Sequence, residues 1–178
     1  MGNFKEEIAC VRGFVFDVDG VFTDGGIIVT PEGDFMRKYN AKDGYAVQYA
    51  IRCGYQVAII TAGRGRCLDV RFEMLGVTHL FTNCHDKMAA LQKFMADTQL
   101  TPAEVLYMGD DIPDMEAMQT TGLPVCPADA TPDIIEISRY VSQYRGGEGC
   151  VRDVIEQVLR ARGDWMKTTN GLGFLPSR

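Results

Sequence analysis

The sequence of 178 residues has no apolar stretch approaching the roughly 20 residues that a helix needs to cross a bilayer. Its first ten residues contain no apolar run and carry Glu6 and Glu7, so we expect no signal peptide. The formal net charge is −6 and the pI is about 4.9, which argues against non-specific binding to nucleic acid or to a membrane surface. Any phosphate site must therefore be built locally, from a cation, a lysine and backbone amides.

Histidine and paired cysteine motifs are scarce as well. With only two histidines, a histidine-based zinc site is not expected. The six cysteines are scattered without a CxxC pair, and we expect reduced and mostly buried thiols in a cytoplasmic protein. The composition, 46% hydrophobic and 24% charged residues, is that of an ordinary globular domain with a core of its own.

Apolar runs alternate with amphipathic stretches along the chain. Strands are expected over residues 11–17, 56–61, 80–83, 105–109 and 123–127, and helices over residues 43–52, 66–75, 86–99, 112–121, 133–140 and 151–162. This alternation predicts an α/β fold with a doubly wound, mostly parallel sheet. A β-hairpin over about residues 25–39 is expected around the turn signal Pro31-Glu32-Gly33-Asp34. Residues 1–162 then form a single domain, followed by a C-terminal tail, residues 163–178, with little structure of its own.

The first predicted strand carries the most informative polar residues. An apolar run ends at Asp17, and Asp19 follows two positions later, just before Gly20. Open α/β sheets bind ligands at the carboxyl ends of their strands, and residues two apart on a strand face the same side. We therefore expect the two carboxylates to converge on a divalent cation, with one of them able to attack an electrophile.

Further polar residues follow later apolar runs. Thr61 ends a strand, where its hydroxyl and the amides after it can bind phosphate oxygens. Lys87 begins a helix, where a cation gains nothing from the helix dipole, so pairing with an anion would explain its position. Asp110, Asp111 and Asp114 follow another strand and repel one another unless a cation is near, although Asp111 or Asp114 could instead cap the next helix. Together these residues predict a magnesium-dependent phosphoryl-transfer site.

In this order, the residues resemble the motifs of the haloacid dehalogenase (HAD) superfamily of phosphohydrolases. The resemblance implies that Asp17 is the nucleophile and forms an aspartyl-phosphate. It implies that Asp19 is the general acid for the leaving alkoxide and then the general base for water. Thr61 and Lys87 would hold the phosphoryl group during its transfer.

The same resemblance implies Mg2+ as the cofactor. Its ligands would be Asp17, the backbone carbonyl of Asp19, and Asp110. Asp111 and Asp114 would support waters or Lys87.

The spacing of these motifs leaves no room for a cap domain. Only a hairpin and one helix fit between Asp19 and Thr61, and only a helix and a strand separate Lys87 from Gly109. With the segments 20–25, 42–44 and 146–153, the chain resembles, over residues 11–162, the capless subfamily of 3-deoxy-D-manno-octulosonate 8-phosphate (KDO 8-phosphate) phosphatases. The resemblance implies a sugar-acid phosphate as substrate, in lipopolysaccharide sugar synthesis. It also implies a homotetramer in which the hairpin of one subunit covers the active site of its neighbour; a hairpin folded onto its own sheet is the alternative.

One departure from that subfamily follows the 56–61 strand. Many members have Thr-Gly-Arg, whereas Thr61-Ala62-Gly63-Arg64 places the arginine one position later. Arg64 could still bind a substrate carboxylate. The shift leaves open a preference for the eight-carbon acid, for a nine-carbon nononate 9-phosphate of the sialic type, or for a broad range of sugar phosphates. The tail could reach an active site, as tails in this family can, or be passive.

Two alternatives from other functional classes are weighed against this interpretation. Response-regulator receiver domains also combine acidic residues, Mg2+, a threonine and a lysine on a doubly wound sheet. Their phospho-acceptor is a lone aspartate ending the third strand, whereas here that strand is followed by Asn83 and Cys84. An inactive assembly module is disfavoured because the five key residues are intact, namely Asp17, Asp19, Thr61, Lys87 and Asp110.

Overall fold

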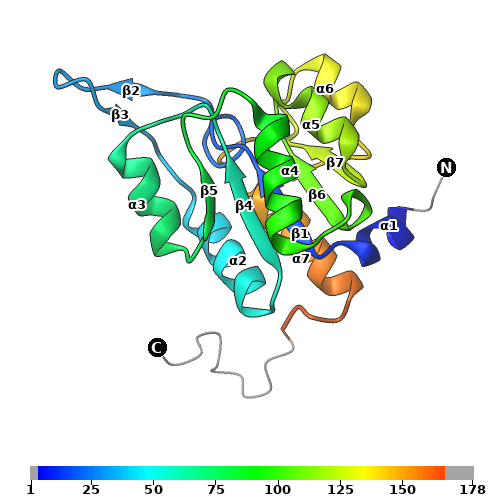
Figure 1. Cartoon of the computed structure of the whole chain (residues 1–178). Helices are drawn as coiled ribbons and strands as arrows, with labels where there is room; N and C mark the ends of the chain where they lie inside the picture. The colour runs from blue at the N-terminus through cyan, green and yellow to red at the C-terminus, as the bar shows by residue number, and fades with distance from the viewer. Residues whose placement is uncertain (1–3, 167–178) are drawn as a thin grey trace.

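A six-stranded parallel sheet forms the centre of the computed structural model, which describes residues 4–166 (Figure 1). Its strands lie in the order β5 (His79–Phe81), β4 (Gln56–Ile60), β1 (Gly13–Phe16), β6 (Val105–Met108), β7 (Leu123–Cys126) and β8 (Tyr140–Val141). In the central register, Phe16 of β1 lies between Ile59 of β4 and Met108 of β6. The mostly parallel α/β sheet predicted from the sequence is confirmed.

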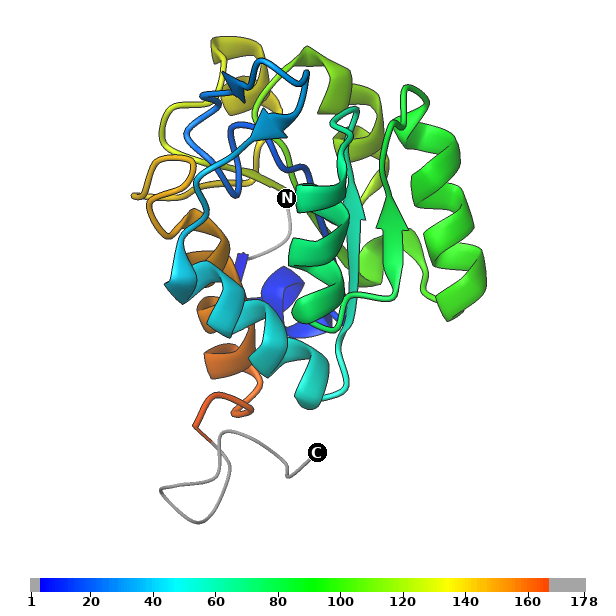
Figure 2. The same ribbon diagram turned by 90° about the vertical axis from the view of Figure 1, so that its left-hand side faces the viewer.

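Helices cover both faces of this sheet. One face carries α1 (Phe4–Cys10), α2 (Ala41–Arg52), α3 (Arg66–Met74) and α7 (Cys150–Ala161), and the other carries α4 (Lys87–Thr98), α5 (Met115–Thr120) and α6 (Pro132–Ile137). Figure 2 shows α4 on the opposite side of β4 and β5 from α2 and α7. Phe14 and Phe16 pack into the core on the α2 and α7 side, while Val15 between them packs on the other side. Strands buried on both faces read as continuous apolar runs, which is why they could be found in the sequence.

The order of the strands creates a switch point beside β1. The chain passes from β1 to β4 and β5 on one side, then returns to β6 on the other side of β1. At such a point the connections leave the sheet in opposite directions, and a crevice opens at the carboxyl ends of the strands. The segments that follow β1, β4 and β6 therefore meet at one edge.

The hairpin consists of β2 (Ile28–Val29) and β3 (Phe35–Met36), which pair antiparallel in a sheet of their own. It projects from the body of the molecule and is not folded onto the central sheet (Figure 1). Its paired strands are shorter than the predicted span of 25–39. The turn is closed where the Thr30 N–H donates to the Asp34 carbonyl at 2.9 Å, with Gly33 at φ +86°.

Several predicted boundaries differ from the structure. The helix α1 and the strand β8 were not predicted from the sequence, and the helix expected over 133–140 ends at Ile137. The helix expected over 112–121 begins as a 3-10 turn, η2 (Ile112–Asp114), with Pro113 in it, and a second 3-10 turn, η1 (Pro102–Glu104), precedes β6. A two-residue strand such as β8 has no periodicity to detect, and its place depends on pairing with β7.

The prediction of mostly buried cysteines is wrong. None of the six, which all lie within residues 4–166, forms a disulfide, and only Cys126 and Cys150 are buried. Cys10, Cys53 and Cys67 are exposed because each lies at the end or in the first turn of a surface helix.

The residues directly after α7 pack against the body. Tyr55 donates a hydrogen bond from its hydroxyl to Asp164 Oδ2 at 2.8 Å, and the Trp165 ring lies 4.9 Å from that of Tyr49. Asp164 and Trp165 therefore pack against the domain, although the sequence placed them in the tail that begins at residue 163. Residues 167–178 lie outside the described residues, and so does the question whether the tail reaches an active site. Among residues 4–166, no helix combines the length and the apolar character needed to cross a membrane.

Candidate active site

The predicted site residues gather at the carboxyl edge of the sheet. Asp17 directly follows β1, Thr61 directly follows β4, and Asp110 lies two residues after β6. A cavity of about 300 Å3 opens there. Its lining includes every predicted site residue except Arg64, namely Asp17, Asp19, Thr61, Lys87, Asp110, Asp111 and Asp114.

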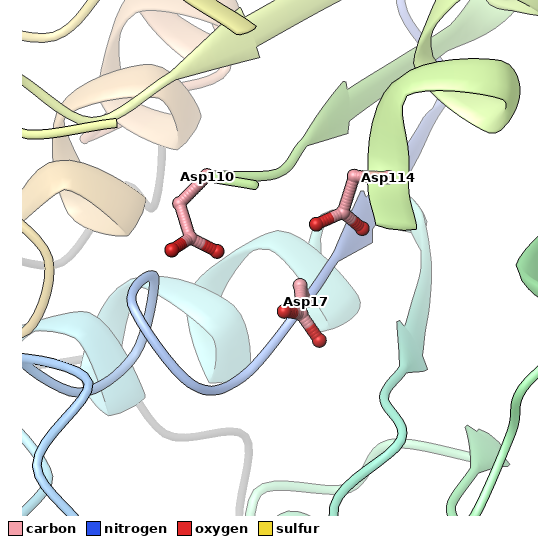
Figure 3. Close-up of side chains that lie close together, drawn as sticks. All are labelled: Asp17, Asp110 and Asp114. Atoms are coloured by element: carbon pink, nitrogen blue, oxygen red, sulfur yellow. The ribbon is translucent and has the colours of Figure 1, made fainter. Parts of the chain in front are cut away.

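Three carboxylates converge in this cavity. One oxygen each of Asp17, Asp110 and Asp114 lies within 4.8 Å of the others, and Figure 3 shows that the three side chains lie close together. Burial, and then repulsion from Asp114, raises the pKa of Asp17 to about 7. Burial and repulsion from Asp17 and Asp114 likewise raise the pKa of Asp110 to about 7. Three carboxylates this close together in a partly buried cavity repel one another, and a bound cation would relieve that repulsion.

Lys87 supplies one positive charge to this group. It is the first residue of α4, where Asp86 caps the helix by accepting from the Ala89 N–H at 2.8 Å. Its Nζ lies 2.7 Å from Asp114 Oδ1 and 3.2 Å from Asp17 Oδ1. Burial lowers the pKa of Lys87, but the two carboxylates outweigh burial and raise it, so the amine stays charged.

Asp17 retains an oxygen for a further partner. Although Lys87 is near, Asp17 Oδ1 is buried and accepts no hydrogen bond of good geometry within the described residues. A buried carboxylate oxygen without a hydrogen bond is costly. A divalent cation or an incoming electrophile would satisfy it.

Asp114 is held by a residue that sequence reasoning missed. The Tyr107 hydroxyl donates to Asp114 Oδ1 at 2.9 Å, from within the buried strand β6. A tyrosine in an otherwise apolar buried strand needs a partner for its hydroxyl, and that signal could have found it. Asp111 instead accepts from the Ile112 N–H at 2.8 Å, so it is Asp111 that caps η2.

Thr61 and the segment after it form a tight turn. The Thr61 hydroxyl accepts a hydrogen bond from the Gly63 N–H at 3.0 Å, and the residue is almost fully buried. The Asn83 N–H donates to the Gly63 carbonyl at 2.8 Å, which ties this turn to the segment after β5. The Thr61 side chain is thereby fixed at the rim of the cavity.

Asp19 lies apart from the three clustered carboxylates. Its side chain forms a two-pronged ion pair with Arg37, whose Nε and Nη2 lie 2.7 and 2.9 Å from the two carboxylate oxygens. Arg37 was not among the site residues predicted from the sequence, where the hairpin was expected to act as an apolar cover. An arginine beside the apolar hairpin residues Phe35 and Met36 was the available signal.

A second cavity, of about 410 Å3, lies next to the first and shares Asp19, Ala62 and Gly63 with it. Arg64 lines this outer cavity together with apolar hairpin residues, Ile27 and Phe35. The structure therefore separates Arg64 from the clustered carboxylates, at a place where the non-reacting part of a substrate could lie.

The remaining motif segments support the loop after β1. A side-chain carbon at Gly146 would collide with the Gly20 carbonyl, so only glycine permits the two loops to pack. Asp43 is fully buried and accepts from the Arg152 N–H at 2.8 Å, which joins α2 to the first turn of α7.

Comparison with known proteins gives a consistent family. The haloacid dehalogenase-like hydrolases match residues 64–154. The 3-deoxy-D-manno-octulosonate 8-phosphate phosphatase of Yersinia pestis is 37% identical over 169 residues, covering 95% of this chain and 90% of that protein. The sequence likeness therefore extends to the segment with Asp17 and Asp19, which precedes residues 64–154.

Solved structures agree with the sequence comparison. The crystal structure of the Yersinia pestis phosphatase superimposes with a TM-score of 0.88 at 37% identity, over 90% of this chain and 86% of that one. A second crystal structure is that of the 3-deoxy-D-manno-octulosonate 8-phosphate phosphatase of Moraxella catarrhalis in complex with a magnesium ion, a phosphate ion and KDO. It superimposes with a TM-score of 0.86 at 29% identity, over 90% of this chain and 92% of that one.

Proposed function

This chain belongs to the haloacid dehalogenase-like hydrolases, in the family of 3-deoxy-D-manno-octulosonate 8-phosphate phosphatases, and from that premise we propose that it hydrolyses KDO 8-phosphate to KDO and inorganic phosphate. The observation that carries the proposal is the setting of Asp17. Its buried oxygen without a hydrogen bond faces Lys87 in a cavity that also holds Asp110 and Asp114. A nucleophile with positive charge nearby is what phosphoryl transfer requires.

The reaction then proceeds in two steps. A carboxylate oxygen of Asp17 attacks the phosphorus, the bond from phosphorus to the sugar oxygen breaks, and Asp19 gives a proton to the departing alkoxide. Water next attacks the phosphorus of the aspartyl-phosphate while Asp19 accepts its proton, and the bond from phosphorus to Asp17 breaks to release phosphate. Thr61 and Lys87 bind the oxygens of the phosphoryl group in both steps.

Mg2+ fits the carboxylates of this site. The buried oxygen of Asp17 that accepts no hydrogen bond of good geometry, and the raised pKa values of Asp17 and Asp110, support a bound cation there. Asp17 and Asp110 would hold it, with the backbone carbonyl of Asp19, and Asp114 lies within reach. When bound, the ion supplies positive charge that offsets the negative charge of the phosphoryl oxygens.

The exposed apolar residues of the hairpin are evidence for contact between subunits. Its apolar residues are exposed, with Ile28 at 63% and Val29 at 62%, and single monomers rarely leave such a group uncovered. We propose a cytoplasmic homotetramer in which this hairpin covers the outer cavity of a neighbouring subunit, with Arg64 contacting the substrate. The product would feed lipopolysaccharide sugar synthesis.

Phosphate release in the presence of Mg2+ tests the proposal across KDO 8-phosphate, a nononate 9-phosphate and simple hexose phosphates. We expect a strong preference for KDO 8-phosphate, measured as kcat/KM. A preference for the nononate would show that the outer cavity selects the longer acid, and equal rates would indicate a broad sugar phosphatase.

The variant Asp17→Asn keeps the shape of the side chain but removes the nucleophile. We expect it to fold, judged by its circular dichroism, and to release no phosphate from any of these substrates. Substantial turnover by this variant would contradict the assignment of Asp17.

A further inference from the structure

Arg37 carries a guanidinium group that is buried although it comes from the projecting hairpin. Its side chain is only 4% exposed, and it lies one residue after β3. Nε and Nη2 bind the two oxygens of Asp19, and Nη1 donates to the Phe35 carbonyl at 3.3 Å. Burying an arginine is costly unless such a pairing compensates for the lost hydration, so the pair holds both side chains in one geometry.

Gly63 supplies the space that this guanidinium occupies. A side-chain carbon built at Gly63 would lie 2.8 Å from Arg37 Nη2, 3.1 Å from Thr61 Oγ1 and 3.2 Å from Leu68 Cδ1. The backbone of Gly63 is not in the left-handed region, so an alanine there would not strain the backbone, but it would force the Arg37 guanidinium to shift. The turn after β4 thus has no side chain at Gly63, and the guanidinium group of Arg37 from the hairpin occupies that space.

Asp19 lies at the junction of the two cavities, and its side chain is 26% exposed. Without Arg37, this partly exposed carboxylate on a loop could adopt other rotamers. A proton donor and acceptor must instead stay within hydrogen-bond reach of the reacting oxygen.

We propose that Arg37 is a positioning residue that holds the carboxylate of Asp19 at the junction of the two cavities, and that Gly63 is required to make room for it. The proposal rests on the proposed role of Asp19 in proton transfer. All three guanidinium nitrogens already have a partner, Nε and Nη2 with Asp19 and Nη1 with the Phe35 carbonyl, so we assign Arg37 an action through Asp19, although it also lines the outer cavity.

The test compares Arg37→Met, Gly63→Ala and the double variant with the wild type, with Arg66→Met as a control for loss of an exposed arginine nearby. Each is assayed with Mg2+ on KDO 8-phosphate and on glucose 6-phosphate, which has no carboxylate but also releases an alkoxide. We expect Arg37→Met to lower kcat about 100-fold on both substrates, since misplacing a reacting group by 1 Å costs about that much, with KM within about twofold. Gly63→Ala should lower kcat in the same way, and the double variant should be no worse than Arg37→Met.

Two other outcomes overturn the proposal. A rise in KM for KDO 8-phosphate alone, with kcat unchanged, would make Arg37 a ligand for the substrate carboxylate. Multiplying defects in the double variant would mean that Gly63 and Arg37 act independently. If the wild type hydrolyses only glucose 6-phosphate, the substrate proposal is wrong, and the Arg37 proposal is judged on that substrate.

Urea unfolding provides a readout that does not depend on turnover. The variants Asp19→Asn, Arg37→Met and their combination should shift the unfolding midpoint non-additively, because either single change removes the same ion pair. Additive shifts would show that the two side chains are not coupled in solution, and the proposal would fail.

Discussion

At the scale of single residues, the site is a problem of charge balance. Three clustered carboxylates face one lysine, and the pKa values of Asp17 and Asp110 rise to about 7 in the absence of a cation. Lys87 touches two of the three carboxylates directly. Its charge therefore matters both to the stability of the fold and to the binding of the phosphoryl group.

Replacing Lys87 with methionine keeps most of the side-chain volume and removes that charge. We expect the free energy of unfolding in EDTA to fall by about 3 kcal/mol, since breaking a buried ion pair leaves charges uncompensated. Mg2+ should then restore more stability to Lys87→Met than it adds to the wild type, because the site is more negative. Urea unfolding with EDTA and with MgCl2 measures both effects.

The matched control is Lys93→Met on the outer face of the same helix, where Lys93 pairs with Asp97 in solvent. That change should cost little and should leave the effect of Mg2+ as in the wild type. An equal response to Mg2+ in all three proteins would mean that Lys87 does not share a site with the ion.

Asp43 predicts a separate dependence of stability on pH. Burial raises the pKa of Asp43 to about 6, against the lowering effect of the Arg152 N–H and of the charges of Arg152 and Arg71, from an ordinary value of 3.8. The folded state thus binds this proton more tightly than the unfolded chain does. Its contribution is present below about pH 4 and is lost as the pH rises through about 6.

The variant Asp43→Asn removes this titration but keeps an acceptor for the Arg152 N–H. Between about pH 4.5 and pH 7.5, the wild type should lose roughly 2 kcal/mol of unfolding free energy relative to the variant, from a pKa shift of about two units. Urea unfolding at the two pH values measures the difference. Parallel pH curves for the two proteins would contradict the assignment.

At the scale of elements, the active site depends on the loop after β1, which packs closely against the loop before α7 at glycine residues. The Gly147 N–H donates to the Val21 carbonyl at 2.9 Å, and Asn40 Nδ2 donates to the Gly147 carbonyl at 3.2 Å. The loop before α7 thus connects the segment after β1 with the start of α2. The functional loop after Asp17 is held by backbone contacts with distant segments of the chain.

Gly146→Ala tests this packing, since its added carbon would meet the backbone of Gly20 and Thr23. We expect a loss of more than about 2 kcal/mol of unfolding free energy together with a lower kcat, because backbone cannot yield as a side chain can. Gly54→Ala is the control: its φ of +87° is strained by about 1 kcal/mol, but nothing lies within 4 Å of the added carbon. If Gly146→Ala lowered the free energy of unfolding no more than Gly54→Ala does, the two loops could not be packed as closely as the structure shows.

The elements also show where sequence reasoning succeeds. The strands β1, β4 and β6 were predicted because most of their residues are apolar and buried between the two helical layers. The hairpin strands β2 and β3 were predicted longer than they are, and β8 was missed, since the extent of such short strands depends on a partner and not on a repeating pattern.

At the scale of the whole molecule, the projecting hairpin indicates an assembly. Four of its apolar side chains are about half exposed or more, namely Ile27, Ile28, Val29 and Met36. Charging this surface with Ile28→Lys and Val29→Lys should dissociate the proposed tetramer, since burying an unpaired lysine is costly. Sedimentation velocity should report the smaller species, and kcat/KM should fall with it.

Met74→Lys on α3 is a control for adding a lysine at an exposed apolar residue elsewhere. It should leave the sedimentation coefficient unchanged. A monomeric wild type, or a double-lysine variant that sediments as the wild type does, would refute the role of the hairpin in assembly.

The sequence by itself determined that Asp17, Thr61 and Asp110 would meet, because each follows a buried strand and parallel strands bring their carboxyl ends to one edge. It also determined the family and the lack of room for a cap. Only the tertiary structure decided which side chains pair: Arg37 reaches Asp19 from the hairpin, and Tyr107 reaches Asp114 from within the sheet. Such pairs depend on how distant segments pack and on which positions leave space, as Gly63 does, and neither is encoded in local spacing.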